Sequence, residues 1–178
     1  MNNLDPHLAA FFRQIDAGER LQLMATRIGL ALWAFQDVES CSALYFAMVA
    51  KLKKGIGVEA SYAILREIQS KPFGATVDGL RKAGLLGPDL QASFDKIREE
   101  RNWLVHRSLS ESRSAVHNET EMERLLGRIE AMQQEARRLL RTIEKLVVTH
   151  AEKAGVSRSQ VQQQVDKTLK EWRGFQSE

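Results

Sequence analysis

Apolar residues recur every three or four positions along most of the chain, the spacing that places them on one face of an α-helix. Their longest unbroken series lies between about residues 118 and 150. It comprises Met122, Leu125, Ile129, Met132, Ala136, Leu139, Ile143 and Leu146. The series predicts one helix about 45–50 Å long, at the usual 1.5 Å per residue. We expect its heptad-like seam to pack within the chain, and a homodimer interface is the alternative.

A second apolar series predicts another long helix over residues 19–54. It comprises Leu21, Met24, Ile28, Leu32, Phe35, Val38 and Phe46. A short helix should precede it over residues 6–16, with Asp5 as its capping residue and Gly18 as its end. Trp33 and Trp103 are expected to be core residues.

Shorter helices complete the predicted fold. They span residues 58–69, 76–82, 89–107 and 158–172. Residues 108–114, rich in serine and charge, should form a loop, and no stretch alternates as a β-strand would. The sequence therefore predicts an all-α helical bundle in which two long helices pack against the 89–107 helix. Residues 1–155 would form the domain, and residues 156–178 a C-terminal helix or tail.

Composition limits the classes of protein that fit. The chain has 178 residues, 43% of them hydrophobic, which suffices for one domain with its own core. Its net charge of +3 permits contact with RNA without requiring it. The single cysteine, Cys41, excludes an internal disulfide framework and a cysteine-based metal cluster. Because neither a signal peptide nor a membrane span is recognisable, we expect a cytoplasmic protein that makes no use of a membrane.

The stretch from Arg101 to His106 carries the side chains best suited to chemistry. Histidine exchanges a proton near neutral pH, and arginine binds phosphate through a planar fork of donors. Together they could cleave RNA without a metal or an organic cofactor. His106 would act on the 2′-hydroxyl or the leaving oxygen, and Arg101 would neutralise charge on the phosphate. Asn102 could orient either residue, and Arg107 and Arg113 are candidates for further phosphate contacts.

Helix geometry limits how these residues can meet. Asn102 and His106 lie one turn apart on the same face. Arg101 and His106 are five positions apart, so on a regular helix their side chains diverge by about 140°. They could converge only through long side chains, at a helix end, or by pairing across two chains.

Glu39 is the other residue that the pattern singles out. It shares a helical face with apolar residues such as Ile28 and Phe35, where a carboxylate is costly to bury unless it is paired. Arg101 is the preferred partner, and Arg98 is the alternative. We therefore hypothesise that Glu39 positions Arg101. The competing interpretation leaves its carboxylate in water at the edge of the bundle.

The segment Arg101-Asn102-Trp103-Leu104-Val105-His106 resembles the motif of the HEPN superfamily: arginine, a polar residue that is often asparagine, three residues, and histidine. HEPN domains are all-helical bundles. Many are metal-independent endoribonucleases of toxin–antitoxin, abortive-infection or CRISPR-linked defence systems, and they often act as dimers that place two motifs together. The resemblance, over about residues 19–150, implies that Arg101 and His106 are catalytic and that Asn102 supports them. It also implies RNA as substrate, a homodimer, and an antitoxin or other protein partner.

Two alternatives to the nuclease remain open. The chain could be a non-catalytic HEPN-like module that binds RNA, a nucleotide or a protein, because a fold alone does not settle function. It could also be a structural adaptor in which Arg101 and His106 satisfy buried acids such as Glu39 or Glu100. An exposed arginine and histidine favour the first two interpretations, whereas a buried, fully hydrogen-bonded pair favours the adaptor.

Overall fold

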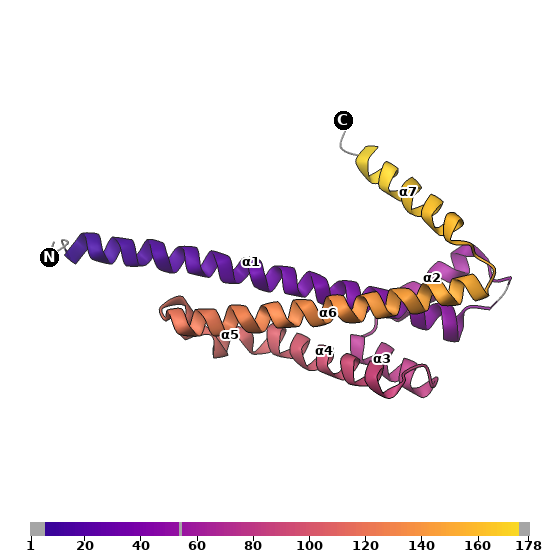
Figure 1. Ribbon diagram of the computed structural model, residues 1–178, viewed down its shortest axis with the longest axis horizontal. Coiled ribbons are helices and arrows are strands. Elements are labelled where there is room, and N and C mark those ends of the chain that lie inside the picture. Colours follow the sequence, from indigo (N-terminus) through magenta and orange to yellow (C-terminus); the bar gives the residue numbers. More distant parts are fainter. Residues whose placement is uncertain (1–5, 54, 175–178) are drawn as a thin grey trace.

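The computed structural model describes residues 6–53 and 55–174, and every regular element in this part of the chain is helical. Two long helices, α1 (Pro6–Phe46) and α6 (Glu119–Lys153), pack along each other and run in the same direction (Figure 1). Helix α4 (Pro88–His106) packs against both and runs the opposite way. The predicted all-α bundle with two long helices is therefore confirmed.

Helix α1 differs from the prediction because it continues through Gly18 without a break. A single glycine costs a helix only about 1 kcal/mol, which the helix-forming residues on either side can offset. At its other end α1 continues into a five-residue π-helix, η1 (Ala47–Lys51). The expected cap, Asp5, the expected last residue, Lys54, and the tail from residue 175 onward lie outside the described residues.

The shorter helices follow the predicted order with shifted ends. Helix α2 (Val58–Gln69) has the predicted bounds, while α3 (Phe73–Lys82) begins three residues early, directly after Pro72. The predicted loop at 108–114 is instead largely helical, with α5 (Ser108–Glu111) followed by the 3-10 helix η2 (Arg113–Val116). Gly155, with φ of +91°, separates α6 from α7 (Arg158–Gly174) as predicted.

The core lies where α1, α3, α4 and α6 meet, and it contains the predicted apolar seam of α6. Seven of the eight predicted seam residues, from Met122 to Ile143, are buried within the chain, so the seam packs internally. Two predicted core residues are instead exposed. Trp33 is 67% exposed because it lies two positions from buried Ala31 and from buried Phe35, on nearly the opposite face of α1. Leu21 is 54% exposed, three positions before Met24, which is buried. The N-terminal turns of α1 extend beyond the other helices (Figure 1).

Candidate functional site

Helix α4 carries the motif, and its buried face fixes where the motif side chains lie. Ile97, Trp103 and Leu104 are buried in the core, so the rotation of the helix about its axis is determined. Arg101 consequently lies beside α1, partly buried, while Asn102 and His106 are exposed. His106 is the last residue of α4 and belongs to its final turn.

Glu39 and Arg101 form an ion pair between α1 and α4. Arg101 Nε donates a hydrogen bond to Glu39 Oε1 over 3.1 Å, and the two side chains are 36% and 28% exposed. Arg98, the alternative partner, instead pairs with Asp95 at 3.4 Å. Within the described residues the structure shows no other partner for Arg101. Its two terminal nitrogens can therefore receive an anion while Nε stays fixed.

Within the described residues, no hydrogen bond or ion pair joins His106 to Arg101. Helix α4 is regular up to His106, so the two side chains diverge by about 140°. The described part of the chain contains no hydrogen bond or ion pair from the His106 side chain. One copy of the protein thus contains a fixed arginine and a free histidine on the same helix end, facing different directions.

The two predicted phosphate-binding arginines follow the motif on short helical segments. Arg107 is exposed and lies 3.7 Å from Glu111, a loose surface pair. Arg113 is exposed at the start of η2. No contact in the described residues connects either of them with Arg101.

A cluster around Trp103 fastens the motif end of α4 to α6. The Arg128 guanidinium lies 3.4 Å from the centre of the Trp103 ring, and Arg128 Nη2 donates to Glu100 Oε2 over 3.0 Å. Trp103 Nε1 donates to Glu111 of α5. Trp103 is 4% exposed, so it is the predicted core residue and offers no free face to a base. Sequence reasoning missed Arg128, because 28 positions separate it from Glu100.

Glu39 also faces a hollow that the sequence did not indicate. A cavity of about 350 Å³ lies between α1, α2 and α3, and Glu39, Ser40, Gln69 and Lys71 are among its lining residues. Polar side chains thus surround the side of Glu39 that is not used by Arg101. No single-sequence signal places α2 beside this part of α1.

Cys41 is a half-buried thiol on α1. Burial, followed by the negative charges of Glu144 and Asp37, raises its pKa from 9.0 to about 11. The thiolate is therefore scarce at neutral pH, and the residue behaves as a packing side chain rather than a nucleophile.

Three further observations complete the description of the site. Among the described residues, no group of three or more His, Cys, Asp or Glu side chains is placed to hold a metal ion. No helix in this part of the chain is long and apolar enough to cross a membrane. Comparison with models of protein families, with curated proteins and with solved structures finds no match to this chain. A functional assignment therefore depends on the geometry of the chain itself.

Proposed function

We propose that this chain is a HEPN-like, metal-independent endoribonuclease in which Arg101 and His106 are the catalytic residues. The observation that carries the proposal is the state of Arg101, which Glu39 holds through Nε while its terminal nitrogens remain available. An arginine that served only to neutralise a buried acid would be enclosed, whereas Arg101 is 36% exposed. His106 is exposed on the same helix end, which also argues against a purely structural role.

The proposed reaction is an internal transesterification of RNA. His106 takes the proton from a 2′-hydroxyl, whose oxygen then attacks the adjacent phosphorus. The bond from phosphorus to the 5′-oxygen breaks, that oxygen takes a proton from water, and the protonated His106 returns its proton to the solvent. The products are a 2′,3′-cyclic phosphate and a 5′-hydroxyl. Arg101 binds the non-bridging oxygens, where negative charge grows, and Asn102, one turn before His106, orients the substrate.

The proposed active form is a homodimer that pairs the motifs of two copies. Because Arg101 and His106 diverge on α4, we propose a site that uses the arginine of one copy and the histidine of the other. Val105 and Leu109 flank His106 and are 45% and 73% exposed, so a second copy would cover apolar surface there. Arg107, directly after His106, and Arg113, at the start of η2, are both exposed, and we assign them to contacts with neighbouring phosphates. An antitoxin that covers this end of a cytoplasmic toxin or defence protein is the alternative partner.

The second candidate function is a non-catalytic HEPN-like module that binds RNA, a nucleotide or a protein. One observation favours it. A catalytic histidine is usually oriented by a partner on its other ring nitrogen, and the described residues supply none for His106.

A cleavage assay tests the proposal directly. Single-stranded and structured RNA would be incubated in excess EDTA with the wild type, Arg101→Ala and His106→Ala. Arg158→Ala, which breaks an exposed pair with Glu152, and His150→Ala, at the far end of α6, are matched controls. We expect at least about a 100-fold loss from each motif variant, a typical contribution of one acid–base or charge-stabilising group, and unchanged rates for the controls. A folded wild type that binds RNA without cleaving it would favour the binding module.

Mixing the two inactive variants tests the shared site. If each site uses Arg101 of one copy and His106 of the other, a mixed dimer keeps one intact site. Random exchange in a two-fold dimer would then restore about a quarter of the wild-type rate. A mixture that stays inactive would show that no such site is shared between copies.

A further inference from the structure

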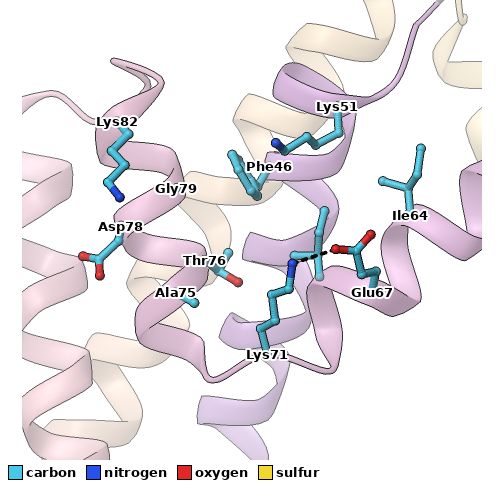
Figure 2. Close-up of a pocket in the computed structure, with 11 residues that line it drawn as sticks. Phe46, Lys51, Ile64, Glu67, Lys71, Ala75, Thr76, Asp78, Gly79 and Lys82 are labelled. Atoms are coloured by element: carbon cyan, nitrogen blue, oxygen red, sulfur yellow. Dashed lines mark hydrogen bonds and ion pairs between the residues drawn. The ribbon is translucent and has the colours of Figure 1, made fainter.

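A lysine-rimmed pocket lies at the end of the bundle where α1 passes into η1. Its volume is about 510 Å³, and its lining includes apolar residues, Phe46, Ile64 and Ile68 among them. Figure 2 shows three lysines entering from three segments: Lys51 from η1, Lys71 from the α2–α3 turn, and Lys82 from the end of α3. Side chains of one charge from three separate segments thus meet around one hollow.

Two of these lysines share one acid, and the third has none. Lys71 Nζ donates to Glu67 Oε1 over 2.7 Å, so that pair is neutral (Figure 2). Asp78, the other acid in the lining, accepts a hydrogen bond from Arg81 over 3.1 Å. Lys51 lies over the ring of Phe46, at 5.4 Å, and its charge also acts on Glu67, where, after the hydrogen bond from Lys71, it helps to lower the pKa of that carboxyl group. Within the described residues the structure shows no acidic partner for Lys82. Because Asp78 is paired with Arg81, the three lysines face one remaining acid, and the pocket has an excess of two positive charges.

The pocket continues toward the candidate site. Ile68, Lys71 and Thr76 line both this pocket and the smaller cavity beside Glu39. The two hollows consequently adjoin: one is lined by Lys51 and Lys82, and the other by Glu39, whose carboxylate holds Arg101. We call these two adjoining hollows the α2–α3 groove.

We infer that the α2–α3 groove binds the backbone of single-stranded RNA and leads it to Arg101. This inference rests on the proposed function. Exposed lysines in excess over acids attract phosphates, and a flexible single strand can follow a groove bounded by several helices. Phe46 offers little to a base, because Lys51 lies over its ring and Gly79 packs against it. Recognition would therefore depend on phosphates and be tolerant of base sequence.

The test measures how RNA binding depends on salt. The His106→Ala protein, which binds substrate without turning it over, would be titrated with a labelled single-stranded oligouridine at several KCl concentrations. Lys51→Ala combined with Lys82→Ala should reduce the slope of log K against log[salt] by about 1.4, since each phosphate neutralised on a single strand contributes about 0.7. Lys153→Ala with Lys170→Ala, two exposed lysines on α6 and α7, is the control pair and should leave the slope unchanged. An equal slope for both pairs, or no RNA binding at all, would overturn the inference.

Cleavage kinetics separate this inference from the proposed function. In the wild-type background, removal of Lys51 and Lys82 should raise KM and leave kcat unchanged, because neither lysine touches the reacting atoms. If the wild type does not cleave but the binding slope falls as expected, the nuclease fails and the groove stands. If it cleaves and both KM and slope are unaffected, the groove fails and the nuclease stands. Binding of inorganic tripolyphosphate without binding of RNA would overturn the groove in favour of a small-anion site.

Discussion

Replacing Glu39 with glutamine tests whether this residue positions Arg101. Glutamine keeps the size of the side chain and a carbonyl oxygen that can accept from Arg101 Nε, so only the charge is lost. The pair lies between α1 and α4 at 3.1 Å, with each partner about one-third exposed. Water therefore screens it substantially, and the loss of stability should be small.

The magnitude follows from that exposure. Ion pairs with such access to water contribute about 0.2–1 kcal/mol, and we expect a double-mutant cycle between Glu39→Gln and Arg101→Gln to give a coupling energy in this range. For a chain of this length, 1 kcal/mol corresponds to a change in Tm of about 2–4 °C. The fold thus stays intact, whereas the cleavage rate should fall about tenfold, equivalent to about 1.4 kcal/mol of transition-state stabilisation.

The assay pairs thermal unfolding with RNA cleavage in EDTA. Asp95→Asn is the matched control, because Asp95 is a similarly exposed acid that pairs with Arg81 and Arg98. It should lower Tm comparably without changing cleavage. Arg101→Lys keeps the charge and loses the planar fork, so we expect it to be less active than Glu39→Gln. A Glu39→Gln protein with wild-type cleavage and no coupling to Arg101 would refute the positioning role.

Three further predictions concern stability and reactivity. Gly79→Ala would place a Cβ 2.6 Å from the Phe46 ring. The control is Gly127→Ala, whose Cβ meets nothing within 4 Å and which should stabilise α6. We expect the Gly79→Ala protein to be less stable than the Gly127→Ala protein by about 1–3 kcal/mol, and equal unfolding free energies for the two variants would contradict this. Because the pKa of Cys41 is raised from 9.0 to about 11, its alkylation at pH 8 should be about 100-fold slower in the native protein than in denaturant. As the pH rises, the Cys41 thiol loses its proton at a lower pH in the unfolded chain than in the folded one. The free energy of unfolding should therefore fall more between pH 9 and 11 in the wild type than in Cys41→Ala. Parallel pH profiles of the two proteins would argue against the raised pKa of Cys41.

The fold could be predicted for those helices in which apolar residues recur regularly over many turns and only one face of the helix is buried. The α6 seam was predicted nearly residue by residue, because its positions repeat every three or four residues over more than six turns. The prediction for Trp33 is wrong because an aromatic side chain alone does not place a residue in the core. Trp33 lies two positions from Ala31 and from Phe35, so it points away from the helical face that both of them bury. The sequence predicts a break at Gly18 that α1 does not have, because a local propensity cannot show how strongly the neighbouring turns continue a helix.

The candidate site could be predicted in part for the same reason. Two considerations are enough to predict that Glu39 pairs with Arg101. Glu39 lies on the apolar face of its helix, and an unpaired carboxylate is costly to bury there. The Trp103–Arg128–Glu100 cluster and the α2–α3 groove depend on how distant helices cross, which neither spacing nor composition contains. Whether Arg101 and His106 act on RNA stays a prediction, since a motif states which side chains are present and not what they bind.

The two halves of the motif are held very differently, and this difference bears on how a site would form. Glu39 on α1 fixes Arg101, and Arg128 on α6 fixes the adjoining Trp103, so this part of α4 is attached to both long helices. His106 lies at the end of the same helix without a partner among the described residues. Efficient proton transfer needs an oriented imidazole, and the described residues of one copy supply no partner that orients His106. If two copies share the proposed site, contact with the second copy would orient His106 as well as bring it to Arg101, and dilution below the dimer dissociation constant should abolish cleavage while leaving the fold intact.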